Sequence, residues 1–207
     1  ETVDEVEKMR VCTCLNPLHT ALAVYGCLLG YNLISEEMKN PSLKKLVEVI
    51  GYKEGLPVVI NPGILDPKEF IDTVLNVRIP NPFMPDTPQR IATDTSQKIV
   101  VRFGETMKSY MASSELDCSS LVYIPLAIAG WLRYLLGTDD KLEKMELSSD
   151  PMLAKLQEKL SGVEAGKPET YTGQLKEILT NKAIFGVDMY EAGLADKVEG
   201  MFVEMLA

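Results

Sequence analysis

The stretch "CLNPLHTALAVYGCLLG", Cys14–Gly30, decides the fold of this chain. Its Asn16-Pro17 pair is typical of a helix start, because Asn is a good N-cap and Pro is favoured in the first helical turn. The residues that follow are apolar on nearly every side of the predicted helix, which indicates a core position. We therefore expect a buried central helix that runs to about Asn32, with His19, the only histidine of the chain, in its first turn.

Helical signals dominate the rest of the chain. The stretch "SSLVYIPLAIAGWLRYLLG", residues 119–137, predicts a second buried helix, and residues 89–111 predict one or two helices with a kink near Asp94. Only 56–60 and 98–103 contain ambiguous runs of β-branched residues. Two buried central helices and no strand pattern indicate a single all-α domain. The remaining helices are predicted over 40–60, with Pro41 and Ser42 at the start, and over 66–79, 149–162, 171–180 and 189–206. A cap is expected at Ser149 or Asp150 for the third of these.

Composition limits the possible functions. The 207 residues carry a formal net charge of −9, which argues against nucleic acid as a partner because such proteins need a basic surface. No apolar run reaches the roughly 18 residues of a membrane span, and no signal peptide is visible. The four cysteines have no disulfide-framework spacing, which fits reduced thiols and a cytoplasmic protein. Because the chain begins in a charged segment without methionine, we expect it to be part of a longer protein.

Several catalytic motifs are missing. The sequence has no G-x-G-x-x-G after a strand, no phosphate-binding G-x-x-x-x-G-K-[ST] loop and no βαβ alternation. A complete nucleotide-dependent enzyme is therefore not contained in these residues. The spacing of Cys12, Cys14, Cys27 and His19 does not match structural zinc sites, so no metal is expected.

Two groups of polar residues are candidates for a site. Asn16 and His19 are three residues apart and share a helix face, where an amide and a neutral imidazole can bind the oxygens of a small polar ligand. The alternative is that Asn16 only caps the helix and His19 is a satisfied core residue. Arg90, Asp94 and Lys98 follow at steps of four, which on a helix gives either a solvated charged stripe or a pair of cations for an anionic or polyhydroxylated ligand.

These same stretches resemble the mannitol dehydrogenase C-terminal domain family. "LNPLHTALAVYGCLLGY" resembles its N-x-x-H helix, and "PNPFMPDTPQRIATDTSQKI" resembles its signature N-P-x-x-x-D-x-x-x-R-I-x-x-D-x-S-x-K. The resemblance implies a helical substrate-binding domain over 1–207, like the C-terminal domain of 6-phosphogluconate dehydrogenase, with its core starting near residue 10. It also implies a Rossmann domain, absent from this chain, that binds NAD or NADP. The second motif is carried by Asn81, Pro82, Asp86, Arg90, Ile91, Asp94, Ser96 and Lys98.

The resemblance also implies roles for individual residues. Asn16 corresponds to the asparagine that polarises the ketone or stabilises the alkoxide. His19 corresponds to a ligand of the substrate hydroxyl, and Arg90 and Lys98 correspond to residues that bind the distal oxygens of the sugar acid or polyol.

The acid/base lysine of the family departs from its usual place, five residues before the asparagine. Val11 stands there. A short insertion around "VCTC" would bring Lys8 into place, and Lys8 is our candidate for proton transfer because burial can lower the pKa of a lysine. Arg10 is an electrostatic alternative that binds substrate, since the pKa of arginine exceeds about 12 and rules out proton delivery near neutral pH.

We therefore expect part of an NAD(P)-dependent oxidoreductase that interconverts a keto-sugar or keto-sugar acid and its alcohol. The cations Arg90 and Lys98 favour fructuronate/mannonate over fructose/mannitol. The partners would be the small substrate and the Rossmann domain, with no nucleic acid and no membrane, and the isolated chain would be inactive. The alternative is a helical binding or interaction module of the same family that no longer catalyses a reaction, for which the displaced lysine argues.

Overall fold

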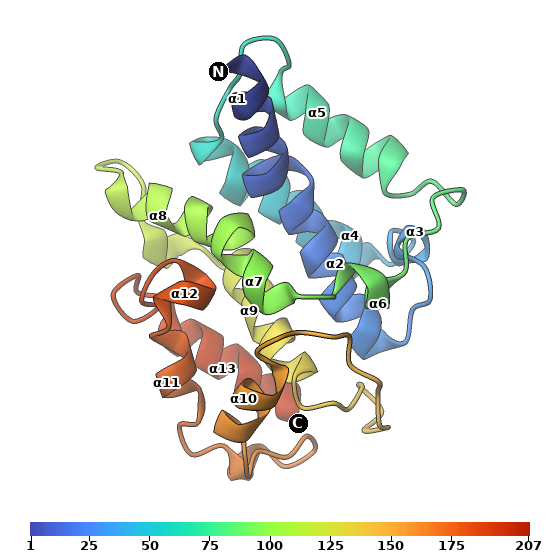
Figure 1. Ribbon diagram of the computed structural model, residues 1–207, viewed down its shortest axis with the longest axis vertical. Helices are drawn as coiled ribbons and strands as arrows, with labels where there is room; N and C mark the ends of the chain where they lie inside the picture. The colour runs from blue at the N-terminus through green and yellow to red at the C-terminus, as the bar shows by residue number, and fades with distance from the viewer.

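The computed structural model describes residues 1–207 and contains helices but no β-strand (Figure 1). The all-α prediction is therefore confirmed, and both ambiguous runs are free of strand, since 56–58 form a 3₁₀ turn and 98–103 lie in helix. The α-helices are α1 (Thr2–Met9), α2 (Asn16–Leu29), α3 (Ile34–Glu37), α4 (Pro41–Glu48), α5 (Pro67–Thr73), α6 (Pro88–Ile91), α7 (Thr95–Ile99), α8 (Glu105–Ala112), α9 (Tyr123–Tyr134), α10 (Leu153–Lys159), α11 (Leu175–Leu179), α12 (Lys182–Phe185) and α13 (Ala195–Leu206).

Wider π-helical turns extend several of these helices. In a π turn the backbone N–H bonds five residues back, so one extra residue is accommodated within a continuous helix. The first, Arg10–Cys14, joins α1 to α2, and Leu15 N–H accordingly donates to Arg10 O over 3.1 Å. The other π segments are Val49–Gly55 after α4, Val74–Arg78 after α5 and Val100–Gly104 between α7 and α8.

The helix that contains the opening stretch is longer than its sequence predicts at one end and shorter at the other. It runs from Thr2 to Leu29, with a local departure from helical dihedrals at Leu15, and crosses the upper half of the molecule (Figure 1). It ends before Asn32, because Gly30 adopts the left-handed conformation at φ 79° and Tyr31 N–H bonds back to Gly26 O. Such a C-terminal glycine stops a helix and satisfies its last carbonyls.

This 28-residue helix is long and apolar enough to cross a membrane by length and composition. The expectation that no segment reaches that length is therefore wrong, because the π turn fuses two shorter helices into one. However, 72% of its most apolar window is buried inside the molecule, as in the core helix of a folded domain.

The predicted pairing of two buried helices is confirmed. Helix α2 packs against α9, and α9 packs against the C-terminal α13, around fully buried side chains such as Leu22 and Trp131. Gly130 permits this close approach, because a Cβ there would lie 2.5 Å from the ring of Tyr25. The Tyr25 hydroxyl in turn donates to Leu126 O over 2.6 Å and ties the two helices together.

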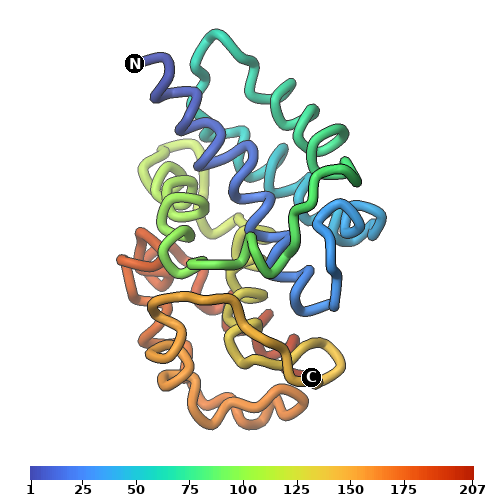
Figure 2. Tube along the Cα trace, turned by 45° about the vertical axis from the view of Figure 1, so that its right-hand side comes forward, coloured from blue at the N-terminus to red at the C-terminus, as the bar shows by residue number.

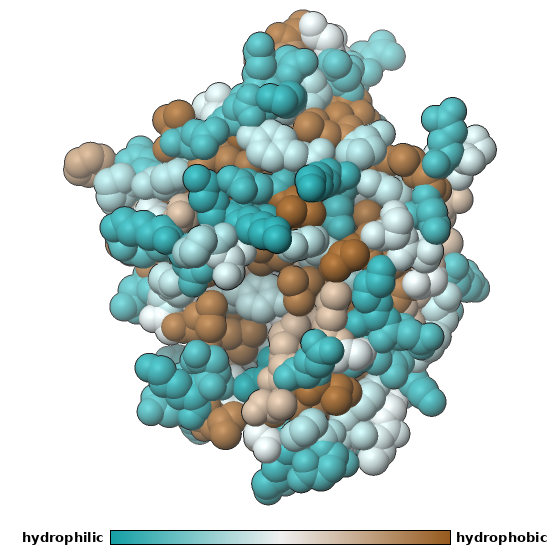
Figure 3. All heavy atoms as spheres, turned by 180° about the vertical axis from the view of Figure 1, so that it is seen from behind, coloured by the Kyte–Doolittle hydropathy of each residue, from teal (hydrophilic) through white to brown (hydrophobic).

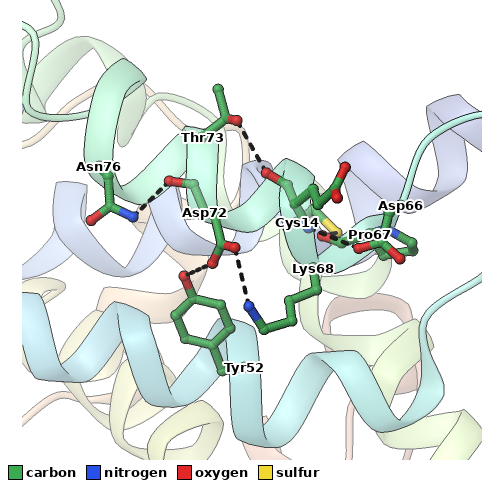
Figure 4. A network of polar contacts seen from close by, with 9 residues as sticks. Cys14, Tyr52, Asp66, Pro67, Lys68, Asp72, Thr73 and Asn76 are labelled. Atoms are coloured by element: carbon green, nitrogen blue, oxygen red, sulfur yellow. Dashed lines mark hydrogen bonds and ion pairs between the residues drawn. The ribbon is translucent and has the colours of Figure 1, made fainter.

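Polar contacts join helix α5 to the 49–55 segment and, at one point, to the long helix (Figure 4). The Asp72 carboxylate accepts hydrogen bonds from the Tyr52 hydroxyl and, over 3.1 Å, from Lys68 Nζ. The thiol of Cys14 lies 3.9 Å from Pro67 O at the start of α5. These contacts fix the wall formed by 67–78 beside the first turn of α2.

The second motif does not form one continuous helix. Asp94 takes the left-handed conformation at φ 56° and separates α6 from α7, so the kink is confirmed. The Asp150 carboxylate accepts from Ser96 N–H over 2.8 Å and also from the Ser96 hydroxyl, and thereby caps α7 from a distant loop. Asp150 also accepts from Met152 N–H over 2.9 Å in the turn before α10, although α10 itself begins at Leu153 and Met152, at its N-cap position, makes no side-chain cap.

The surface agrees with the acidic composition. On the side opposite to that of Figure 1, hydrophobic residues occur in separate groups among hydrophilic ones (Figure 3).

All four cysteines are free thiols, and Cys14, Cys27 and Cys118 are buried. Burial raises the pKa of the Cys14 thiol to about 12, so this thiol stays protonated near neutral pH.

Candidate active site at the first turn of the long helix

The amide of Asn16 is not a helix cap. The backbone is already helical there, Leu15 occupies the position before the helix, and no side-chain capping bond forms. The second Asn-Pro pair of the chain provides the contrast, because Asn40 Oδ1 accepts from Ser42 N–H over 2.9 Å at the start of α4. The capping interpretation of Asn16 is therefore wrong, and its half-buried amide makes no hydrogen bond with the rest of the protein.

His19 lies one turn further along α2 and is uncharged near neutral pH. Burial lowers the pKa of its imidazole to about 4. The nearby Asp86 carboxylate opposes this shift, whereas the positive charges of nearby arginines, chiefly Arg78, lower the pKa further. A neutral imidazole presents one donor and one acceptor nitrogen. His19 can therefore bind a hydroxyl group without bringing its own charge.

The segment 100–106 covers this face of the long helix. Arg102 Nη1 donates to the Thr20 hydroxyl over 2.6 Å, and the Thr106 hydroxyl lies 3.4 Å from Cys12 O. Asn16 lies between these two contacts, one turn before Thr20. Arg102 is thus a site residue that the motif analysis missed, although it follows Lys98 at the same four-residue step as that motif's own charged residues.

The two predicted substrate cations differ in their surroundings. Arg90 is 64% exposed and forms an ion pair with Asp86. Lys98 is half-buried, and its Nζ donates to Thr93 O over 2.5 Å. Burial, together with the Arg102 charge, lowers the pKa of Lys98. Because Asp94 breaks the helix, the predicted single stripe of Arg90, Asp94 and Lys98 does not form.

The second motif nevertheless lies over α2. Helix α6 packs on α2, and the chain from α6 to α7 crosses the long helix (Figure 2). Arg90 and Arg102 both contribute to the electrostatic environment of His19. The fold therefore brings parts of the two motifs together, seventy and more residues apart in the sequence.

The π turn determines where the candidate proton-transfer residues lie. Asn16 follows Lys8 by eight residues, and the π turn between them contains one extra residue. This spacing corresponds to about two helical turns, so Lys8 and Asn16 share a face. Their backbones are about 12 Å apart along the helix axis. Arg10 lies on another face of the helix and pairs with Glu7 over 2.9 Å. The side chains of Lys8 and Arg10 are both exposed, so the burial expected around Lys8 is not found. The structure thus brings Lys8, but not Arg10, to the side of the helix that carries Asn16.

Lys8 borders a cavity of about 330 Å³ between the first helical turns, the 58–60 segment and α8. Cys12, Thr13 and Thr106 also line it, which places the cavity on the N-terminal side of Asn16. The described residues contain no group of three side chains placed to hold a metal ion. They also form no strand and no glycine-rich phosphate loop, so they do not fit a dinucleotide-binding fold.

Comparison with known proteins gives a consistent family. The model of the "Mannitol dehydrogenase C-terminal domain" family matches residues 2–206. A D-mannonate oxidoreductase of Thermotoga maritima is 55% identical over 206 residues, which are 100% of this chain and 38% of that protein. A mannitol 2-dehydrogenase of Pyricularia oryzae is 30% identical over 188 residues, 90% of this chain and 34% of that protein.

Solved structures agree on the fold. A structure described as Pseudomonas fluorescens mannitol 2-dehydrogenase in ternary complex with NAD and D-mannitol superimposes with a TM-score of 0.80 at 21% identity. It covers 96% of this chain, which spans 37% of that protein. The chain thus spans between one third and two fifths of the length of these relatives.

Proposed function

Because the chain belongs to the mannitol dehydrogenase C-terminal domain family, we propose that it is the substrate-binding part of an NAD(P)-dependent oxidoreductase. The full enzyme would interconvert a keto-sugar or keto-sugar acid and its alcohol. The observation that carries the proposal is the free amide of Asn16 beside the neutral imidazole of His19, on a helix face covered by cationic residues.

Asn16 and His19 bind the reacting end of the substrate. The Asn16 amide donates to the carbonyl oxygen, and this bond strengthens as negative charge develops on that oxygen. His19 holds the neighbouring hydroxyl. Arg90 and Lys98 bind oxygens further along the sugar chain, where Lys98, already desolvated and fixed on Thr93 O, loses little additional hydration.

Lys8 exchanges the proton of the reacting hydroxyl. By helical spacing it shares the face of Asn16, and it borders the cavity on the N-terminal side of Asn16; Arg10 remains the electrostatic alternative. NAD or NADP, bound by a Rossmann domain outside this chain, would supply the hydride chemistry. No step assigned to this chain requires a metal.

The favoured substrate pair is fructuronate and mannonate, with fructose and mannitol next. The cationic surroundings of His19 in a chain of net charge −9 support an acidic substrate. A relative named for mannonate, 55% identical, supports the same choice. A steady-state comparison on the full-length protein tests this preference, and a higher kcat/KM for fructose than for fructuronate would reject it.

Asn16→Ala in the full-length enzyme tests the proposed role of the amide. We expect kcat to fall by about 100-fold or more, the loss typical of an oxyanion donor. Asn40→Ala is the matched control, because it removes the same amide from the other Asn-Pro pair. The control should lower the free energy of unfolding by about 1 kcal/mol and leave kcat unchanged. Equal kcat for Asn16→Ala and the wild type would refute the assignment.

We further propose that the domain comprises residues 1–207 with a core that starts near residue 10, which the full burial of Met9 supports. The isolated chain would then have no dehydrogenase activity. Turnover by the isolated chain would overturn the assignment of substrate binding to this chain and of NAD(P) binding to a separate domain. The protein would act in the cytoplasm. The second candidate, a binding module without catalysis, is favoured by Val11 in place of the usual lysine. Absence of any NAD(P)-dependent turnover by the full-length protein would support it.

A further inference from the structure

Arg102 is a half-buried arginine whose guanidinium pairs with no carboxylate of the chain. Its one hydrogen bond within the protein is the 2.6 Å contact from Nη1 to the Thr20 hydroxyl, and it takes part in no ion pair. Its other N–H groups are not enclosed, so they reach open space beside the helix. Desolvating a charge without a counter-charge is unfavourable, so the position calls for an explanation.

Arg133 gives an internal comparison. This buried arginine donates from Nε to Met205 O over 3.1 Å, from Nη1 to Thr138 O over 2.7 Å and from Nη2 to Asp139 O over 2.9 Å. All three of its nitrogens are therefore used to join α9 to the end of α13 and to the 138–139 loop. Arg102 lacks such a set of partners, and a purely structural role does not account for its placement.

The location of Arg102 relative to Asn16 suggests what its free donors bind. Thr20 follows Asn16 by four residues, which corresponds to about 6 Å along the helix. In a six-carbon keto acid with four bonds between the carbonyl carbon and the carboxylate carbon, these carbons are about 5 Å apart at ordinary C–C bond lengths. A substrate whose carbonyl lies at Asn16 can thus extend along the helix and place its far end at Arg102.

The other arginine of the motif is less suited to this task. Arg90 is 64% exposed and already paired with Asp86, so a bound carboxylate would have to compete with that partner. Arg102 is partly desolvated and held in place by Thr20. Its planar guanidinium can donate two parallel hydrogen bonds to the two oxygens of a carboxylate.

We propose that Arg102 is a specificity-determining residue that binds the terminal carboxylate of a sugar-acid substrate. The inference rests on the proposed function and adds a selectivity mechanism to it. A neutral polyol or ketose of the same length presents a hydroxymethyl group to Arg102 and leaves the half-buried charge unneutralised. The enzyme therefore discriminates through this one residue between a sugar acid and its uncharged counterpart.

Arg102→Gln in the full-length enzyme tests the inference, with kcat/KM measured for D-fructuronate and for D-fructose. We expect the fructuronate-to-fructose ratio to fall by about 100-fold, chiefly through KM for fructuronate, as is usual when one partner of a desolvated charge pair is removed. Lys108→Gln is the matched control. It removes a positive charge from the adjoining α8, where Lys108 is exposed and pairs with Glu105, and it should leave the ratio unchanged.

Arg102→Lys keeps the test informative if the glutamine variant does not fold. It retains the charge but loses the two-pronged geometry, and it should reduce the ratio by about 10-fold. Parallel losses on both substrates, or an unchanged ratio, would overturn the role of Arg102. A wild-type enzyme that reduces fructose but not fructuronate would also overturn it while the dehydrogenase assignment stands. A wild type that turns over neither substrate would instead remove the proposed function.

Discussion

Glu37 should make the stability of this fold depend on pH. Its carboxyl group is fully buried at the end of α3, packs against Gly26 and Pro88, and has no hydrogen-bond partner on either oxygen. This burial raises the pKa of Glu37 from 4.5 to about 9. The folded state therefore retains the proton over a pH range in which the unfolded chain has already released it.

The sign and size of the effect follow from this difference. Proton release is easier in the unfolded state, so the contribution of Glu37 to stability is complete below pH 4.5 and decreases as pH rises towards 9. Each pKa unit corresponds to about 1.4 kcal/mol, so the free energy of unfolding should fall by about 3 kcal/mol between pH 5 and pH 7.5 from this group alone.

Glu37→Gln removes the titration and keeps the side-chain shape. We expect the variant to match the wild type at pH 5, where the buried carboxyl is neutral, and to exceed its stability by about 3 kcal/mol at pH 7.5. Urea denaturation of the purified chain at both pH values measures the difference. Using the difference between variant and wild type cancels other titrating groups, among them His19, whose lowered pKa destabilises the fold as pH falls from 6.5 towards 4.

The neighbouring carboxylate provides the control for this experiment. Glu36 is 44% exposed and paired with Lys39, so Glu36→Gln should change stability by less than about 1 kcal/mol at either pH. The reasoning about Glu37 is refuted if the stability gap between Glu37→Gln and the wild type is the same at pH 5 and pH 7.5.

Three other substitutions test contacts that hold the fold together. Gly26→Ala would place a Cβ 2.2 Å from Glu37 Oε1, and we expect urea denaturation to detect a loss of about 3 kcal/mol; a loss below 1 kcal/mol would mean that α3 shifts to accommodate the methyl group. Arg133→Met leaves the carbonyls of Thr138, Asp139 and Met205 without these donors and should cost about 3–5 kcal/mol in the same assay, whereas a neutral result would show that water replaces the guanidinium. Asp150→Ala removes the cap from Ser96 N–H, so stability should fall by about 1–2 kcal/mol and KM of the full-length enzyme should rise. An unchanged KM would separate this cap from substrate binding.

Most of the fold could be predicted from local patterns. Pro41 and the Asp66-Pro67 pair marked true helix starts, whereas the long helix ends at Gly30 and not near the predicted Asn32. The π turns could not be predicted, because hydrophobic periodicity changes little when one residue is inserted into a buried helix. The cap that Asp150 provides for Ser96 was also hidden, since it joins residues 54 positions apart.

The candidate site was only partly accessible from the sequence. Spacing placed Asn16 and His19 on one helical turn, and the structure agrees. Spacing failed for Arg90, Asp94 and Lys98, because a helical stripe requires every residue between them to be helical and Asp94 is left-handed. The pairing of Arg90 with Asp86, and the lack of any such partner for Arg102, depend on tertiary packing that no four-residue periodicity describes.

The two Asn-Pro pairs explain how one dipeptide can serve two purposes. Capping requires a residue in extended conformation whose side chain turns back to the next N–H groups. Asn40 meets this condition with φ −83° and ψ 117°. Near Asn16 the π turn ends at Cys14 and Leu15 takes the N-cap position, so the Asn16 backbone is already helical and its side chain caps no N–H group. The extra residue in "RVCTC" therefore does two things at once: it turns Lys8 onto the face of Asn16 and releases the Asn16 amide for a ligand. Deleting one residue from this segment in the full-length enzyme should consequently impair catalysis more than folding.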